Sequence, residues 1–450
     1  HPMMRAEMNR DDWTEIQIDR VVGATHHFGG AGVGNVASQS HAGQVSNPAA
    51  AAIQGLEKMR LISGLGVPQW ILPPQVRPDF GFLRQMGFAG DDAEVLKRAR
   101  DESPTLLSAA MSSSAMWTAN AATVTVATDS QSGIFETAIS VANLNSSLHR
   151  AIEPNETRDD LRAVFGDTVR VHPPLVGGVA MRDEGAANHM RLMGSRIQDS
   201  FDVFVYGDQP PTPQKYFARQ TLASFEAIAR RHDLAADAVC YLKQHPDAID
   251  AGAFHNDVVA MSHHDLMIHH ELAFADNAAS MTKLEAEFHR QTGQTLTRIE
   301  VSAAELSIGD AIATYLFNSQ IVSLPDRNVP PTIICPIQVE RHAAARKRVM
   351  GWQQDGLFSQ VVFVDLGQSM SGGGGPACLR LRVPMSLQQI ENLNPRSRWT
   401  DRLHGAITQI IRDGYPTSVT LDDLASIEFV RHAGRVRDQI AIQLGREILS

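Results

Sequence analysis

Hydrophobic and polar residues along this chain predict strands and helices that follow one another from end to end. Short apolar runs rich in β-branched and aromatic residues predict strands at 123–128, 201–206, 332–337, 361–366 and 379–383. Hydrophobic residues three or four positions apart predict helices at 218–231, 282–291 and 436–449. This interleaving favours an α/β fold, formed by one domain or by several fused subunits.

Two local patterns add detail to this picture. Leu379, Leu381 and Val383 alternate with two arginines, so the strand there is expected to have one buried face and one wet or functional face. The proline-rich segment 210–213 lies between a predicted strand and a predicted helix, which indicates a surface loop rather than a domain boundary. No linker divides the chain cleanly, and no internal repeat is visible at the level of single residues.

Composition narrows the class of protein. The chain has 450 residues, of which 43% are hydrophobic and 20% are charged, which is typical of a globular protein and excludes a collagen-like or wholly disordered chain. The net charge of −10 makes nucleic acid and anionic membranes poor partners. No apolar run is long enough for a membrane span, and the first residues do not resemble a signal peptide. Residues 1–3 are expected to include an added remnant, because His1 precedes a Met.

The chain has three cysteines, Cys240, Cys335 and Cys378. An odd, sparse set without a CxxC motif argues against a disulfide framework and a structural zinc site, and it fits a reducing cytoplasm. Cys378 follows four consecutive glycines, 372–375, and opens a predicted strand. A glycine run occurs where the backbone must pass close to another group, and a thiol beneath a mobile glycine loop is well placed for nucleophilic attack. The alternative is a buried structural cysteine beside a flexible hairpin.

A nucleophilic cysteine needs a base and an orienting group, and two segments could supply them. His255 and Asp257 are two residues apart, so on a strand both would face the same side. In segment 182–189, Asp183 and Glu184 precede glycine and small residues, a pattern typical of a turn with closely approaching backbone. A solvated turn is the alternative for each segment.

Two further patterns invite a ligand interpretation. The chain has 18 histidines, but their spacing matches no standard zinc motif, and we expect no metal site. The segment from Gly29 to Asn35 is rich in glycine, yet it has neither the dinucleotide fingerprint nor the P-loop lysine. It is either a loop that lines another ligand or a plain surface turn.

Several motifs, taken together and in order, resemble the N-succinylarginine dihydrolase family of the pentein (guanidino-group-modifying) superfamily. They run from residue 25 to residue 383 and are THHF at 25–28, GN at 34–35, AS at 37–38, QVSNP at 44–48, MW at 116–117, ANAAT at 119–123, VANLN at 141–145, HR at 149–150, DEGAANH at 183–189, ARQT at 218–221, FHNDV at 254–258, TYLFNSQ at 314–320 and GGGPACLRLRV at 373–383.

The resemblance implies a single catalytic domain over 1–450 with an α/β fold, a five-bladed pseudo-symmetric α/β propeller. The implied reaction converts N2-succinyl-L-arginine and two waters into N2-succinyl-L-ornithine, two ammonia and CO2, in the arginine succinyltransferase route of arginine catabolism. It also implies a small-molecule substrate, a homodimeric assembly and no cofactor. Matched motif by motif, Cys378 is the nucleophile, His255 the general acid and base, and Glu184 the accompanying acid. The implied substrate contacts are Gly29, Gly30, Ala31, Gly32, Val33, Gly34, Asn35, Val36, Ala37, Ser38, Asn120, His149, Arg150, Arg219, Asp257 and Gly372, the last standing where the family commonly has Asn.

Elementary chemistry fits these assignments. A carboxylate such as Asp257 can hold a planar guanidinium through two hydrogen bonds, and the bound cation favours the Cys378 thiolate. The thiolate attacks the guanidinium carbon, His255 protonates the departing ammonia and then activates water, and the cycle repeats on the ureido group. Arg150 and Arg219 are candidates to bind the substrate carboxylates. The alternatives are an arginine deiminase or amidinotransferase acting on another guanidino substrate, and a non-catalytic protein that binds acylated amino acids.

Overall fold

The computed structural model describes residues 12–448, and these contain five sheets of three strands each. The strand orders are β15–β1–β2, β3–β4–β5, β6–β7–β8, β11–β10–β9 and β12–β13–β14. The strand bounds are β1 Trp13–Arg20, β2 Gln69–Leu72, β3 Ala122–Thr128, β4 Phe135–Val141, β5 Arg170–His172, β6 His189–Met193, β7 Ser200–Tyr206, β8 Val239–Lys243, β9 Ala260–His263, β10 Leu266–His270, β11 Thr297–Val301, β12 Gln320–Val322, β13 Thr332–Pro336, β14 Gln360–Val364 and β15 Arg380–Ser386.

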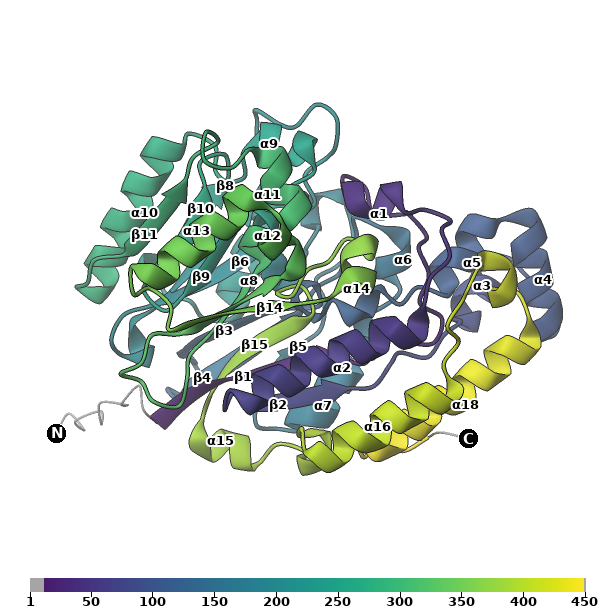
Figure 1. Ribbon diagram of the computed structural model, residues 1–450. Helices are drawn as coiled ribbons and strands as arrows, with labels where there is room; N and C mark the ends of the chain where they lie inside the picture. Colours follow the sequence, from purple (N-terminus) through teal and green to yellow (C-terminus); the bar gives the residue numbers. More distant parts are fainter. Residues whose placement is uncertain (1–11, 449–450) are drawn as a thin grey trace.

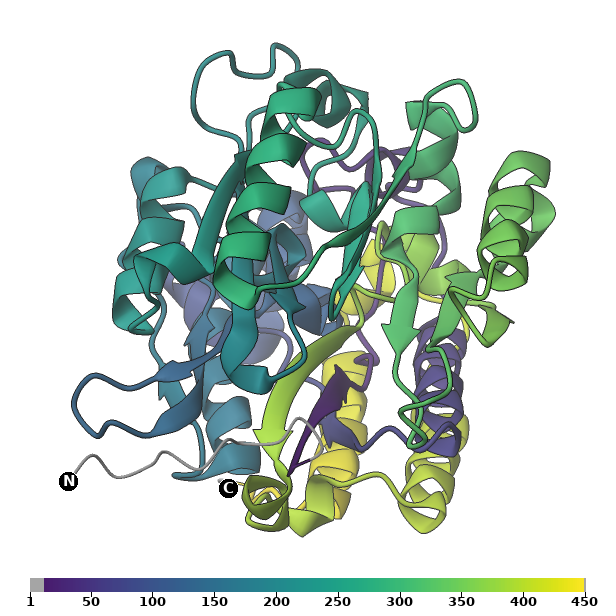
Figure 2. The same cartoon turned by 90° about the vertical axis from the view of Figure 1, so that its left-hand side faces the viewer.

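Every sheet repeats the same pairing. Its middle strand is antiparallel to one neighbour and parallel to the other. Parallel strands need a long crossover, and here each crossover contains a helix: α2 (Pro48–Gly64), α7 (Pro154–Phe165), α8 (Leu222–Arg231), α10 (Asn277–Thr292) or α13 (Ala343–Gln354). The fold is therefore five β-β-α-β units. One unit is assembled from both ends of the chain, since β15 pairs with β1 (Figure 2).

The remaining helices cover the sheets and form a lobe at one side (Figure 1). Helices α16 and α18 pack against each other, and α16 also packs on α2. Side chains of α3, α4 and α5 share a hydrophobic cluster with α17 and the start of α18. The bounds of these and the other short helices are α1 Val36–Ser40, α3 Phe80–Gln85, α4 Asp92–Glu102, α5 Pro104–Ala110, α6 Leu148–Ala151, α9 Pro246–Ala251, α11 Ile308–Thr314, α12 Ile337–Arg341, α14 Gly367–Gly372, α15 Leu387–Glu391, α16 Asp401–Gly414, α17 Leu421–Leu424 and α18 Ile427–Gln443.

The strand predictions are confirmed, with small shifts at their ends. They overlap β3, β7, β13, β14 and β15. In β15, Leu381 and Val383 are buried in a core cluster, whereas Arg380 and Arg382 line a small interior cavity. The alternation therefore marks a core face and a polar interior face, as expected from period-two strands.

The helix predictions are less accurate at the ends. Helix α8 begins later than predicted because the Thr221 hydroxyl caps it by accepting the backbone N–H of Ser224. The prediction of a helix at 436–449 is wrong at its start, because α18 begins after the cap residue Ser426. It also ends too late: α18 stops at Gln443, just before Gly445, whose positive φ of 76° does not continue a helix. Residues 449 and 450, like 1–11, lie outside the described residues.

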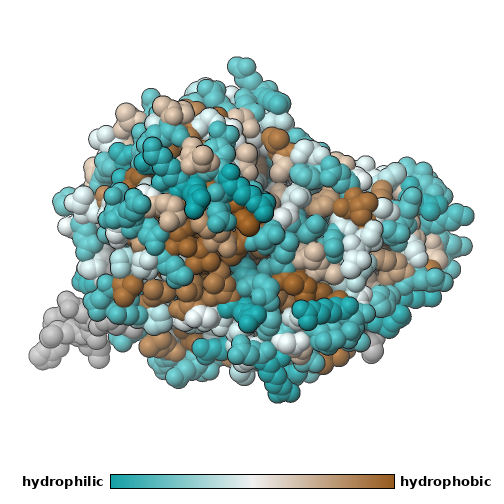
Figure 3. Space-filling model, viewed as in Figure 1, coloured by the Kyte–Doolittle hydropathy of each residue, from teal (hydrophilic) through white to brown (hydrophobic). Residues whose placement is uncertain are grey.

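The face seen in Figure 3 is mostly hydrophilic, with hydrophobic residues gathered around β14. This strand lies at the edge of its sheet, and its residues 361–364 are only half-buried. Among residues 12–448, no helix is both long enough and apolar enough to cross a membrane.

Candidate active site

Cys378 lies two residues before β15 and is 2% exposed. Its backbone N–H donates to Asn318 Oδ1 at 3.2 Å, and its carbonyl accepts the N–H of Ala119 at 3.1 Å. Its Sγ lies 3.6 Å from Asp257 Oδ2. The cysteine is thus fixed at its backbone and faces a carboxyl group.

The glycine run before Cys378 is packed rather than mobile, which corrects the expectation of a mobile loop. A Cβ atom at Gly373 would lie 1.9 Å from Asn35 Nδ2, and one at Gly374 would lie 2.1 Å from Trp117 Nε1. Real Cβ atoms do not approach other atoms so closely. The other half of the expectation is confirmed: glycine is used here because backbone passes close to neighbouring side chains.

His255 and Glu184 form a buried pair, and both side chains are fully buried. His255 Nε2 lies 2.9 Å from Glu184 Oε1. Burial would raise the pKa of Glu184, but Arg150, His255 and Arg219 outweigh burial and hold that pKa well below its usual range. Burial lowers the pKa of His255 to about 4, against the opposing effect of Glu184. The pair is therefore an ionised carboxylate and a neutral imidazole, whose Nε2 carries the proton and whose Nδ1 can accept one.

Residues 255–257 do not form the strand that the sequence suggested. His255 precedes the 3-10 helix η8 (Asn256–Val258), because the N–H of Val259 turns back to the carbonyl of Asn256. Both functional side chains nevertheless reach the site, since Glu184 contacts His255 and Cys378 contacts Asp257.

The turn predicted after Glu184 is present as the 3-10 helix η5 (Gly185–Asn188). Gly185 has a positive φ of 64°, and a Cβ there would lie 2.7 Å from the carbonyl oxygen of Asn120. The expected close approach of backbone is confirmed, and it brings Asn120 next to the segment that carries Glu184.

Two buried arginines accompany Glu184. Arg150 Nη1 donates to Glu184 Oε1 at 2.8 Å, and Arg219 Nη1 lies 3.6 Å from the same oxygen. Arg219 Nε also donates to the carbonyl of Val33 at 3.2 Å, and its guanidinium lies 4.6 Å from the centre of the Phe254 ring. Burial lowers the pKa of Arg219 to about 10. Arg219 therefore stays charged at neutral pH, and the two guanidinium groups surround one carboxylate.

Asp257 and Cys378 influence each other's ionisation. Burial raises the pKa of Asp257 to about 7. Burial, followed by the charge of Asp257, raises the pKa of the Cys378 thiol well above its ordinary value. The thiol is therefore neutral in these surroundings, and an added positive charge beside it would favour the thiolate.

Several buried polar atoms of this cluster lack a hydrogen-bond partner among residues 12–448. They are Glu184 Oε2, His255 Nδ1, Asp257 Oδ1, Asn120 Oδ1 and Arg150 Nη2. Leaving a buried polar atom unpaired costs about 1–3 kcal/mol. Such a group of acceptors beside one donor is the arrangement expected around a bound polar molecule that has several N–H groups and a carboxylate.

A cavity of about 330 Å³ adjoins this cluster. Of the residues expected to contact substrate, those that line it are Gly29, Gly30, Ala31, Val33, Ser38, His149 and Gly372. Gly372 lies against Trp117, whose ring would be 3.1 Å from a Cβ at that position. Burial, followed by the charges of Arg150 and Arg219, lowers the pKa of His149 to about 3.

The other residues of the loop from Gly29 to Ser38 do not line this cavity. Asn35 caps α1 by accepting the N–H of Ser38, and its Nδ2 donates to the carbonyl of Gly373 at 3.1 Å. Asn35, Val36 and Ala37 line a different hollow, bounded also by Phe254 and Tyr315. Neither cavity has Gly32 or Gly34 among its lining residues.

Asn318 was not singled out from the sequence, although its amide joins two site residues. Its Oδ1 accepts the N–H of Cys378, and its Nδ2 donates to the carbonyl of Asp257 at 3.0 Å. Nearby, the Tyr315 hydroxyl donates to the carbonyl of Gly373 at 2.7 Å. Both lie in the motif at 314–320, which therefore carried a signal for them.

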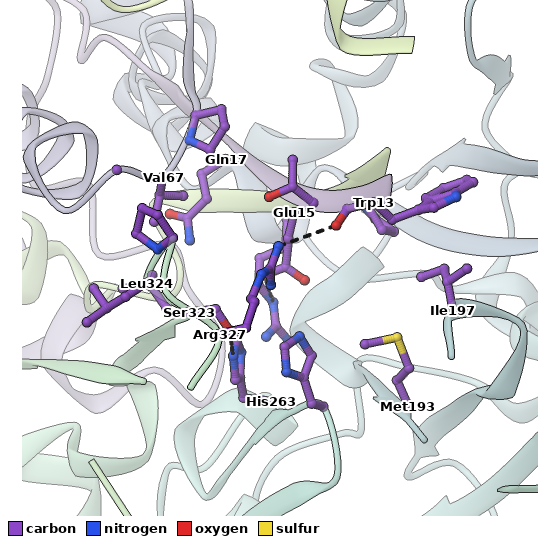
Figure 4. Close-up of a pocket in the computed structure, with 18 of the residues that line it drawn as sticks. Trp13, Glu15, Gln17, Val67, Met193, Ile197, His263, Ser323, Leu324 and Arg327 are labelled. Atoms are coloured by element: carbon purple, nitrogen blue, oxygen red, sulfur yellow. Dashed lines mark hydrogen bonds and ion pairs between the residues drawn. The ribbon is translucent and has the colours of Figure 1, made fainter. Parts of the chain in front are cut away.

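Another cavity, of about 80 Å³, lies apart from this cluster (Figure 4). Its walls include Trp13, Gln17, Val67 and Arg327, and within it Glu15 pairs with Arg191 at 2.7 Å. The residues that line this cavity include none of those predicted to be functional. Among residues 12–448, no group of three His, Cys, Asp or Glu side chains is placed to hold a metal ion.

The fold and this site define an α/β protein with a buried cysteine, a histidine–glutamate pair and two arginines around one polar centre. The chain belongs to the succinylarginine dihydrolase family, whose family model matches residues 12–448.

Individual relatives agree with this assignment. The chain is 40% identical over 442 residues to the N-succinylarginine dihydrolase of Chromohalobacter salexigens, covering 96% of this chain and 97% of the relative. It is 40% identical over 438 residues to that of Serratia proteamaculans, covering 96% and 97%. Among solved structures, the N-terminal domain of ArgZ, an arginine dihydrolase from cyanobacteria, superposes with a TM-score of 0.50 at 16% identity, covering 82% of this chain and 97% of that chain. Unliganded AgrE gives a TM-score of 0.51 at 16% identity, covering 82% and 40%.

Proposed function

We propose that this protein hydrolyses N2-succinyl-L-arginine to N2-succinyl-L-ornithine, two ammonia and CO2. One arrangement carries the proposal: the buried Cys378 thiol faces Asp257, and Glu184 contacts His255. Asp257, Glu184 and His255 each have a buried polar atom without a hydrogen-bond partner among the described residues. Family membership supplies the substrate class.

In this proposal the guanidinium binds where the unpaired carboxylate oxygens lie. Asp257 Oδ1 and Glu184 Oε2 accept its N–H groups. The bound cation offsets the negative field of Asp257, so the thiol pKa falls and Cys378 loses its proton to Nδ1 of His255. The substrate therefore helps to create its own nucleophile.

The first cycle exchanges one nitrogen for oxygen. The thiolate forms a C–S bond to the guanidinium carbon, one C–N bond breaks, and His255 gives its proton to the departing nitrogen, which leaves as ammonia. Water then attacks the covalent thiouronium while His255 takes a proton from it, and the C–S bond breaks to release the ureido group.

The second cycle acts on that neutral ureido group. A second ammonia leaves, and hydrolysis of the thiocarbamate gives a carbamate that loses CO2. Asp257 suits both cycles because its pKa is raised to about 7. It can be ionised beside a cation and protonated beside a neutral group.

The rest of the substrate occupies the adjoining cavity. Arg150 Nη2 and Arg219 bind the α-carboxylate, and Asn120 Oδ1 accepts an N–H group of the substrate. The loop from Gly29 to Ser38 lines the path of the succinyl chain, together with His149 and Gly372.

We also propose that the five β-β-α-β units are the blades of a pseudo-symmetric propeller, and that the chain is one catalytic domain with the site at its centre. The shared strand pairing of the five sheets supports this arrangement. A homodimer is proposed because β14 leaves apolar side chains half-buried at a sheet edge. The buried, unpaired cysteines favour a cytoplasmic location.

The test is the amount of ammonia released per N2-succinyl-L-arginine consumed, run to completion with EDTA present. We expect two, and none from a folded Cys378→Ala variant that still binds the substrate. One ammonia would identify a deiminase instead. No consumption by the folded wild-type protein, or full activity in Cys378→Ala, would overturn the proposal.

A further inference from the structure

The cavity beside the catalytic cluster contains many hydroxyl groups and few ionisable ones. Its walls include Thr105 and seven serines: Ser38, Ser108, Ser112, Ser113, Ser114, Ser146 and Ser147. Its ionisable lining residues, within the described part of the chain, are three histidines, and neither Lys, Arg, Asp nor Glu is among them. Because neither Lys nor Arg is among these lining residues, an imidazole is the group of the cavity wall that can place a positive charge beside a bound carboxylate.

His27 has the geometry to do so. Its Nδ1 lies 2.9 Å from the carbonyl of Thr25, which can only accept, so Nδ1 carries the proton of the neutral ring. Its Nε2 lies 2.8 Å from Ser108 Oγ and must then accept the serine hydroxyl. Both side chains line the cavity. Gly29 packs directly against them, because a Cβ at Gly29 would lie 2.7 Å from Ser108 Oγ and 3.5 Å from His27 Nε2, so the absence of a side chain there keeps the pair uncovered.

Protonation would reverse the polarity of this pair. When Nε2 gains a proton, it becomes a donor, and the Ser108 hydroxyl hydrogen is released to point into the cavity. One proton therefore creates two donors and a positive charge at one place, which is the combination a carboxylate requires.

The other two histidines are less suited. Burial and the neighbouring His27 lower the pKa of His26 to about 3. Burial and the charges of Arg150 and Arg219 lower the pKa of His149, so they oppose its protonation. Burial lowers the pKa of His27 as well, but its hydrogen bond to the carbonyl of Thr25 acts in the other direction and favours the charged ring. Among the described residues, the titratable side chains that interact electrostatically with His27 are His26 and His149. Ser114, which also lines the cavity, donates to Glu153, and burial raises the pKa of that carboxyl.

We propose that His27 and Ser108 bind the distal carboxylate of the substrate's acyl group, and that His27 takes up one proton from solvent as this carboxylate binds. The proposal rests on the proposed function, because it assumes that an acylated arginine occupies the cavity. It makes His27 a determinant of acyl specificity that is separate from the groups acting on the guanidinium.

The test is isothermal titration calorimetry of the Cys378→Ser protein with N2-succinyl-L-arginine and with N2-acetyl-L-arginine, which lacks the distal carboxylate. Repeating each titration at pH 8 in buffers of different ionisation enthalpy counts the protons taken up. We expect close to one more proton for the succinyl compound than for the acetyl compound. Equal proton uptake for the two compounds would overturn the proposal.

Substitution gives a second readout. In Cys378→Ser/His27→Asn, the preference for the succinyl over the acetyl compound should fall about tenfold or more, the size of one lost hydrogen bond to a charged group, and the extra proton should disappear. Ser108→Ala, a smaller change, should lower the same preference in case His27→Asn fails to fold. His289→Asn, at an exposed histidine of α10, is the matched control. A preference unchanged in both cavity variants would also overturn the proposal. If the proposed function itself were wrong, wild-type protein would not release two ammonia from N2-succinyl-L-arginine, a result obtained independently of the calorimetry.

Discussion

The side-chain amide of Asn318 accepts the backbone N–H of Cys378 at 3.2 Å and at the same time donates to the backbone of Asp257. One side chain therefore fixes the spacing between the thiol and the carboxyl that faces it. This contact links the 3-10 helix η9 (Leu316–Asn318) to the start of β15 and to η8. A small shift of Asn318 would move Cys378 relative to Asp257.

Removing this amide should reduce turnover more than substrate binding. Asn318→Ala loses both hydrogen bonds, and a displacement of about 1 Å at a reacting group costs on the order of a hundredfold in rate. We expect kcat to fall about 10- to 100-fold while KM changes much less, measured by ammonia release. A kcat equal to that of the wild type would show that Cys378 is held well enough by the packed glycines alone.

Glu184→Gln should disable the site and weaken the fold together. The amide no longer balances Arg150 and Arg219, and breaking a buried ion pair costs about 3–5 kcal/mol of unfolding free energy. Loss of the carboxylate beside His255 should lower kcat about 10²- to 10³-fold.

Urea unfolding and steady-state kinetics would measure the two effects. Ser146→Ala is the comparison, because its hydroxyl also donates to Glu184, at 3.1 Å, yet carries no charge. It should cost about 1 kcal/mol. Equal effects of the two substitutions would contradict a charge-based role for Glu184.

The pKa of Asp257, raised to about 7 by burial, gives a pH dependence of binding. Below pH 7 the carboxyl is protonated and no longer attracts a guanidinium. We therefore expect KM for N2-succinyl-L-arginine to rise as pH falls from 8 to 6, approaching tenfold per unit at the acid end. In Asp257→Asn, KM should be high across this range. A KM independent of pH in the wild type would rule out ionised Asp257 as a guanidinium ligand.

The same group affects stability in the opposite direction. A buried acid whose folded pKa lies above its unfolded value favours the fold while it is protonated. That contribution is complete below the unfolded pKa, about 3.9, and is lost as pH rises through 7. The unfolding free energy of the wild type should therefore decrease between about pH 4 and pH 7 more steeply than that of Asp257→Asn and level off above pH 7, as measured by urea unfolding at each pH.

Two glycine-to-alanine changes should have opposite signs. At Gly374 the new methyl group would collide with the Trp117 ring, so stability should fall by about 1–3 kcal/mol and activity should fall with it. At Gly434, inside α18, a Cβ has nothing within 4 Å, so alanine should stabilise the helix by about 0.5–1 kcal/mol. Thermal unfolding of both variants checks this. A neutral Gly374→Ala would mean that Trp117 can move aside at little cost.

The sequence indicated more of the fold's elements than of their assembly. Short apolar runs located β3 and β7, and a period-two pattern located β15 and its buried face, because a half-buried strand repeats every second residue. The five-fold repetition of sheets was invisible, since it is a property of strand pairing and not of residue identity. The end of α18 was missed because hydrophobic spacing continues past the point at which Gly445 turns the chain.

The candidate site shows the same division. Cys378, His255 and Glu184 were found from residue type and motif, and the structure places Glu184 against His255. The side chain that contacts the Cys378 thiol is Asp257 rather than His255, and this depends on a 3-10 turn that the spacing did not reveal. Asn318 was not singled out within the motif at 314–320, because an amide that joins two other residues is defined by tertiary contacts and not by its residue type.

The pairing of β1 with β15 has a consequence for how this protein matures. These strands are far apart in the sequence, so their sheet cannot form until residues 380–386 have been synthesised and have returned to β1. Contacts between such distant segments slow folding, because a large loop must close before they are made. Cys378 lies two residues before β15, so its thiol reaches its place opposite Asp257 when this strand joins β1. The spacing between the Cys378 thiol and the Asp257 carboxyl therefore depends on a sheet that joins distant parts of the sequence.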